Sequence, residues 1–160
     1  MLLLRDGQAQ APAIHRADYQ APAWWIDTVD LTFDLDPAKT RVLNKMRLRR
    51  NPDVAAQPLR LDGEELNLAR VMVNGGGTSF KMNGNQLVLE NLPEGTESFD
   101  LEIFTTCAPA KNTQLMGLYV SQGTFFTQCE AEGFRRSPSL RARPYVNATH
   151  SRTLRADKAL

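Results

Sequence analysis

Cysteine and histidine are both scarce, with two of each among 160 residues. Cys107 and Cys129 form no Cys-x-x-Cys pair, which excludes a zinc knuckle and a thioredoxin-type motif. Two thiols allow one disulfide, but small secreted scaffolds use more, so we expect both thiols to be reduced. His15 and His150 lack the His-Glu-x-x-His spacing that puts two imidazoles on one helix face, so we expect this chain to bind no zinc.

Long hydrophobic runs are also absent. Only three leucines precede the charge at Arg5, too few for the apolar core of a signal peptide, and no run approaches the ~18 residues of a membrane span. We therefore expect a cytoplasmic chain with no membrane partner. A net charge of +1 gives no global field for nucleic acid. Residues 133–160 carry a basic excess, but they lack the interleaved aromatics of a nucleic-acid platform, so we expect no nucleic-acid partner either.

Strict alternation of apolar and polar residues is the main signal that the sequence does contain. Residues 28–35 alternate with period two, which predicts a half-buried strand. Residues 36–39 read Asp-Pro-Ala-Lys, a turn in which proline pre-sets φ and Asp36 accepts hydrogen bonds from the following backbone. Alternation resumes over residues 42–48, and the two strands are predicted to form a hairpin.

The same pattern recurs about every ten residues. Residues 66–73 change phase midway, which predicts a bulge, and residues 118–126 surround Gln122-Gly123, which predicts a second hairpin. The remaining expected features are strands at 59–61, 87–89 and 99–103, turns at Asp62-Gly63, 83–85 and 92–95, and a loop at 74–77. No long segment has helical period, so we predict an all-β, mainly antiparallel domain.

Composition divides the chain into three segments. Residues 1–22 are rich in Ala, Pro and Gln and lack periodicity, which predicts an extended lead-in. Residues 23–136 form the predicted β-domain. Residues 137–160 are basic and interrupted by prolines, and we interpret them as a truncated, divergent C-terminal segment of the same domain.

Residues 105–136 contain the best candidates for binding or catalytic side chains. This segment reads TTCAPAKNTQLMGLYVSQGTFFTQCEAEGFRR. Polar acceptors cluster directly after a hydrophobic strand, where Glu130 and Glu132 follow Gln128. A carboxylate at a strand end can receive an ammonium group through a charge-assisted hydrogen bond worth about 1.5–3 kcal/mol. The pattern alone favours the simpler interpretation that these carboxylates are solvated in a turn.

Several ordered blocks resemble the bacterial aminopeptidase N family of zinc alanyl aminopeptidases. The hallmark is TQCEAEGFRR at residues 127–136, and APAKNTQLMGLY precedes it as in that family. VDLTFDLDPAKT and LRLDGEELNL stand where the family has its opening strands. The resemblance covers most of residues 15–136.

The resemblance implies an N-terminal β-saddle that precedes a thermolysin-like catalytic domain. It implies release of N-terminal residues from peptides, with alanine preferred, and zinc held by ligands that are not in this chain. Within the hallmark, Glu130 is expected to bind the substrate α-amino group and Gln128 to line the pocket for the first residue. Glu132 is expected to be structural. The implied partners are the peptide N-terminus and the catalytic domain.

Residues 137–146 depart from the family, where an aromatic strand is expected, and family-like residues return at 153–158. This departure puts the packing of the last strand in doubt. We expect the chain alone to be inactive, because it lacks His-Glu-x-x-His. Two alternatives remain open, namely a stand-alone all-β binding or scaffolding module and a non-functional truncated product.

Overall fold

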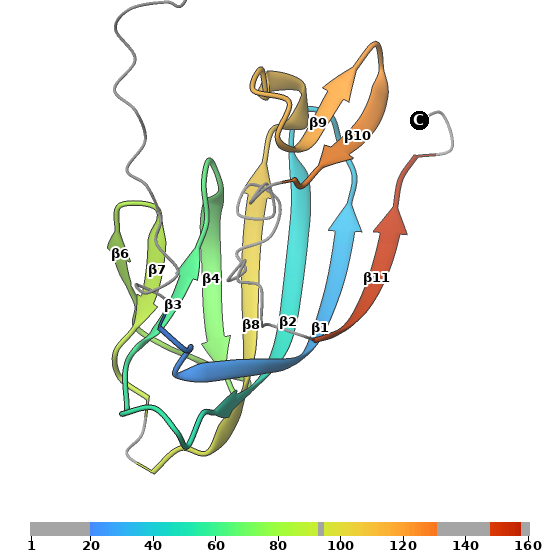
Figure 1. The fold of residues 1–160 in the computed structure, drawn as a ribbon. Coiled ribbons are helices and arrows are strands. Elements are labelled where there is room, and N and C mark those ends of the chain that lie inside the picture. The colour runs from blue at the N-terminus through green and yellow to red at the C-terminus, as the bar shows by residue number, and fades with distance from the viewer. Residues whose placement is uncertain (1–19, 93–94, 131–147, 158–160) are drawn as a thin grey trace, which may run out of the picture.

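A computed structural model describes residues 20–92, 95–130 and 148–157. Its main sheet has six strands in the order β11–β1–β2–β8–β4–β5 (Figure 1). These strands are β11 (Thr149–Arg155), β1 (Trp24–Asp34), β2 (Thr40–Arg50), β8 (Ser98–Cys107), β4 (Asn67–Val73) and β5 (Gly76–Gly77). All neighbouring pairs are antiparallel except β1 and β11, so the predicted all-β, mainly antiparallel fold is confirmed.

The β1–β2 hairpin follows from the alternation in the sequence. Val29 pairs with Met46 and Leu31 with Asn44, so the apolar side chains of both strands share one face of the sheet. Asp36 Oδ1 accepts hydrogen bonds from the backbone N–H groups of Ala38 and Lys39, each at 2.8 Å. The predicted hairpin and its Asx-type turn are therefore both confirmed.

A smaller sheet covers part of this apolar face. It has the order β3–β7–β6, formed by Leu59–Asp62, Gln86–Leu89 and Lys81–Asn83. Leu61 and Leu87 oppose each other in the β3–β7 pair and join Leu48 and Phe99 in one core cluster. Trp24 meets the Phe99 ring edge-on, with centroids 5.1 Å apart and an interplanar angle of 78°.

The opposite face of the main sheet is charged. Lys45 and Glu102 oppose each other across β2 and β8, and Arg47 lies 3.0 Å from Asp100 in the same strand pair. Such exposed cross-strand pairs contribute modestly to stability, but they keep this face polar. Among the described residues, the core therefore lies on one side of the main sheet.

Two turn predictions required correction. Residues 74–77 were expected to be a loop, but Gly76 and Gly77 pair back with β4 as β5. Asn74 and Gly75 take φ values of 50° and 78°, the positive values that a tight two-residue hairpin requires. The turn expected at Asp62-Gly63 lies slightly later, where the chain bends at Glu64 and Glu65 and Glu65 has a φ of 56°.

The predicted bulge in the fourth strand is confirmed by a register shift between Leu68 and Arg70 against β8. At the opposite edge, β11 runs parallel to β1, and the Leu35 N–H donates to the Arg155 carbonyl at 2.7 Å. All seven residues of β11 are exposed. Most of the expected lead-in and the divergent residues 137–147 lie outside the described residues.

Candidate functional site

The hairpin predicted around Gln122-Gly123 carries the predicted site residues. Strand β9 (Gly117–Ser121) pairs with β10 (Thr124–Gln128). The β9–β10 hairpin lies beyond the ends of β8 and β2, at the same end of the sheet as the β1–β2 turn (Figure 1). Gln122 and Gly123 form its turn with φ values of 49° and 80°, which confirms the predicted hairpin. Tyr119 and Phe126 stack across it with ring centroids 5.5 Å apart.

The approach to this hairpin is held by one amide side chain. Asn112 Nδ2 donates to the backbone carbonyls of Met116 at 2.8 Å and Leu118 at 2.9 Å, while its Oδ1 accepts from the N–H of Gln114. The preceding 3-10 turn, Pro109–Lys111, is tied to the β1–β2 turn by the N–H of Ala110, which donates to the Pro37 carbonyl. No motif in the sequence marks Asn112 as the residue that positions the hairpin.

Both predicted site residues lie at the end of β10. Gln128 opposes Gly117 and, by the alternation of a strand, shares a face with Phe126. Gln128 and Glu130 are both exposed, and Glu130 follows the strand in a turn. Within the described part of the chain, no hydrogen bond or ion pair engages the Glu130 carboxylate. Glu132 lies outside the described residues.

An apolar groove of about 280 Å³ separates the hairpin from the inner face of β1 and β11. Phe126 is 44% exposed and Leu154 is 66% exposed, so large apolar side chains on both sides of the groove face solvent. The groove is lined by Leu31, Phe33, Leu35, Leu118, Phe125, Phe126, Thr127, Cys129, Arg152 and Leu154. The groove lies close to Glu130, because Cys129, the residue before it in the chain, is one of the lining residues.

The two cysteines are free thiols with different surroundings. Burial raises the pKa of Cys107 from 9.0 to about 11. Burial also raises the pKa of Cys129, while the nearby positive charge of Arg152 acts in the opposite direction. Arg152 comes from β11, so the last strand contributes a cation to the groove, a contact that sequence spacing does not indicate.

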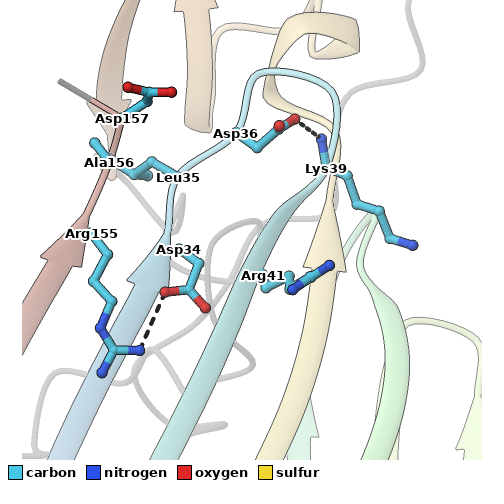
Figure 2. Close-up of a pocket in the computed structure, with 8 residues that line it drawn as sticks. All are labelled: Asp34, Leu35, Asp36, Lys39, Arg41, Arg155, Ala156 and Asp157. Atoms are coloured by element: carbon cyan, nitrogen blue, oxygen red, sulfur yellow. Dashed lines mark hydrogen bonds and ion pairs between the residues drawn. The ribbon is translucent and has the colours of Figure 1, made fainter. Parts of the chain in front are cut away.

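A second hollow of about 460 Å³ lies beside the β1–β2 turn (Figure 2). Arg155 lies 3.4 Å from Asp34 there, and Asp36 is engaged by the backbone of its own turn. Three acidic and three basic side chains line the hollow, namely Asp34, Asp36, Asp157, Lys39, Arg41 and Arg155. These charges balance, so the hollow does not select an ion of one sign.

No zinc site can be assembled from residues 20–92, 95–130 and 148–157, where no three His, Cys, Asp or Glu side chains gather as ligands. His150 is exposed on β11, and His15 lies outside these ranges. The described ranges also contain no helix long and apolar enough to cross a membrane.

Comparison with known proteins shows which proteins the chain is similar to. The chain is 43% identical over 150 residues to aminopeptidase N of Escherichia coli, a match that covers 93% of this chain and 17% of that protein. The aminopeptidase A of Legionella pneumophila, solved in complex with aspartic acid, superposes with a TM-score of 0.76 at 28% identity, covering 86% of this chain and 16% of that one. No protein-family model matches the chain.

A second solved structure shares the fold alone. The M1 zinc metallopeptidase of Deinococcus radiodurans, solved as an E323A mutant with a Tyr-Ser-Ala substrate, gives a TM-score of 0.66 at 16% identity, with 82% of this chain and 32% of that chain covered. The fold is therefore that of the N-terminal β-domain of the M1 aminopeptidases.

Within that class, the resemblance to bacterial aminopeptidase N predicted from the hallmark segment is confirmed over 93% of the chain. The chain spans about a sixth of the length of these relatives.

Proposed function

We propose that this domain supplies substrate-amine recognition to a zinc-dependent aminopeptidase that releases N-terminal residues, preferentially alanine, from peptides. Glu130 receives the α-amino group and Gln128 lines the pocket for the first side chain. The observation that carries the proposal is the exposed Glu130 carboxylate just after β10, which has no partner among the described residues and lies within a segment related to aminopeptidase N.

The charge of Glu130 accounts for selection of chain ends. A carboxylate enclosed between two domains loses water and is costly unless a cation pairs with it. A peptide N-terminus provides an ammonium group there, whereas an internal peptide bond provides none. A charge-assisted hydrogen bond of this kind contributes about 1.5–3 kcal/mol, which is roughly a 10- to 150-fold effect on binding.

The rest of the reaction belongs to a second domain. Zinc activates water in peptidases of this type, and its ligands lie in the catalytic domain of the complete enzyme. We expect that domain to cover the groove beside the hairpin, because Phe126 and Leu154 expose apolar surface next to Glu130. The isolated chain is expected to be inactive, and the complete enzyme is expected to work in the cytoplasm.

A segment graft tests this assignment. Residues 105–130 of this chain replace the matching segment of E. coli aminopeptidase N, and hydrolysis of an alanine anilide is measured. We expect the graft to be active, and Glu130→Gln to lower kcat/KM at least about tenfold, mainly through KM. Glu102 lies on the charged face of the sheet and outside the graft. Glu102→Gln is therefore made in this chain, beside Glu130→Gln in this chain, to compare the effects of the two substitutions on folding.

An inactive graft, or a Glu130→Gln graft with unchanged kcat/KM, would overturn the assignment. Added zinc should give no hydrolysis by this chain alone, and activity of the purified chain would contradict the division of labour between domains.

A further inference from the structure

The chain enters the β9–β10 hairpin through a sharp bend. Leu115 and Gly117 both take left-handed backbone conformations, with φ values of 56° and 73°. This region is unfavourable for residues that have a Cβ atom, so it is usually occupied by glycine. Since β9 begins at Gly117, two left-handed residues within three positions turn the chain directly at the base of the hairpin.

Hydrogen bonds hold this bend in place. Asn112 Nδ2 donates to the Met116 carbonyl at 2.8 Å and to the Leu118 carbonyl at 2.9 Å, so the two acceptors lie on either side of Gly117. Leu115 is 53% exposed, and burial of its side chain therefore compensates little for its backbone conformation. Unfavourable backbone conformations persist where surrounding contacts impose them, and they cluster at functional sites. The bend is thus imposed by the Asn112 hydrogen bonds.

Gly117 lies directly opposite Gln128 in the pair at the base of the hairpin. Gly117 is buried, whereas Gln128 is exposed. Pairing fixes the two backbones relative to each other, so the direction in which Gly117 leaves the bend also sets the position of the end of β10. Glu130 follows Gln128 by two residues. A change of φ at Gly117 would therefore move the segment that carries both predicted site residues.

A second glycine in the same hairpin provides a matched comparison. Gly123 has a φ of 80° in the turn, at the opposite end of the hairpin from the Gly117–Gln128 pair. A Cβ atom at Gly123 would meet nothing within 4 Å. An alanine at either glycine carries a similar backbone cost, but only one of the two positions lies beside Gln128.

We propose that Gly117 is a positioning residue for the amine site, which consists of Glu130 with Gln128 beside it. Its left-handed conformation directs β9 so that the opposing end of β10 presents both side chains to the substrate. This role rests on the proposed function, because it requires that Glu130 binds the amine. Gly117→Ala would disfavour the left-handed conformation roughly 5- to 30-fold and would redirect the base of the hairpin.

The test uses the active graft of residues 105–130 in aminopeptidase N of E. coli. The inhibition constants of an alanine-derived inhibitor and its des-amino analogue are measured, and their ratio is the amine effect. We expect Gly117→Ala to lower the amine effect about fivefold or more. Gly117→Asn should lower it less, about threefold, because asparagine adopts positive φ more readily. Gly123→Ala should leave the amine effect unchanged despite its similar backbone cost.

An unchanged amine effect in Gly117→Ala would overturn the proposal. Equal losses in Gly117→Ala and Gly123→Ala would also overturn it, since the loss would then reflect the stability of the hairpin alone. If Gly117→Ala fails to fold, Gly117→Asn decides, and an unchanged amine effect in that variant would contradict the role of Gly117.

Glu130→Gln separates this inference from the proposed function. If Glu130→Gln leaves the amine effect of the graft unchanged, the proposed function is wrong and the role of Gly117 is wrong with it. If Glu130→Gln removes the amine effect but Gly117→Ala does not lower it, the proposed function stands and only the role of Gly117 is wrong.

Discussion

Asn112 Nδ2 lies 2.9 Å from the carbonyl oxygen of Leu118, so a loop side chain is bonded directly to the first strand of the hairpin that ends in Glu130. The same nitrogen also donates to the Met116 carbonyl. The position of the exposed carboxylate therefore depends on an amide that does not belong to the hallmark motif.

Replacement of Asn112 by alanine should destabilise the hairpin more than the sheet. The change leaves two backbone carbonyls without their donor, and we expect the free energy of unfolding to fall by about 1–3 kcal/mol. Urea unfolding measures the loss, and hydrogen exchange should show it concentrated in β9 and β10. Asn91→Ala is the matched control, because Asn91 makes one exposed hydrogen bond, to Ser79. Equal effects of the two substitutions would contradict this role.

The core should depend strongly on Phe99, which is fully buried against Trp24. We expect Phe99→Ala to lower the free energy of unfolding by about 3–5 kcal/mol, because it removes apolar contacts and leaves a cavity. Phe80 is 39% exposed, so Phe80→Ala should cost less, about 1–2 kcal/mol. Thermal and urea unfolding measure the loss of stability in both variants. Similar losses would contradict the burial of Phe99 against Trp24.

The thiol of Cys107 should be slow to react. Burial raises its pKa to about 11, so little thiolate exists at pH 8, and alkylation by iodoacetamide should keep accelerating up to about pH 11. The folded state holds this proton more tightly than the unfolded state. The stability contributed by Cys107 is therefore present below about pH 9 and is lost as the pH rises to about 11.

Peptide mapping of the alkylated protein measures the rate at each thiol, and Cys129→Ser isolates Cys107. A Cys107→Ala variant should lose less stability between pH 9 and 11 than the parent chain. Rapid alkylation of Cys107 at pH 8 would contradict the burial of this thiol.

Arg152 should control the reactivity of Cys129. Its positive charge lowers the pKa of that thiol, so Arg152→Gln should raise the pKa and slow alkylation of Cys129 near neutral pH. Arg155 lies on the same strand but pairs with Asp34 on the opposite face, which makes Arg155→Gln the matched control. If neither substitution changed the rate, the parallel register of β11 against β1 would be in error.

Local pattern predicted the parts of the fold in which neighbours in sequence are neighbours in space. The β1–β2 and β9–β10 hairpins follow from alternation and from turn residues that favour the required φ values. The pairing of β3 with β7 did not follow, because Leu61 and its partner Leu87 lie far apart in the sequence, and strand pattern does not specify distant partners.

The site was predicted unevenly for a related reason. Gln128 and Glu130 were predicted through resemblance alone, since two polar residues after a strand are equally typical of a solvated turn. Asn112 and Arg152 escaped prediction because their partners are defined by the folded chain, one by backbone carbonyls and one by a thiol from another strand.

Recognition of the substrate amine by Glu130 is tested most directly by inhibition of the grafted aminopeptidase with a pair of ligands that differ only in that amine. The inhibition constants of an alanine-derived inhibitor and its des-amino analogue are compared before and after Glu130→Gln. With Glu130 present, loss of the amine should weaken inhibition about 10- to 150-fold, and after Glu130→Gln that ratio should fall toward one. An amine effect of the same size in both proteins would contradict the proposed role of Glu130.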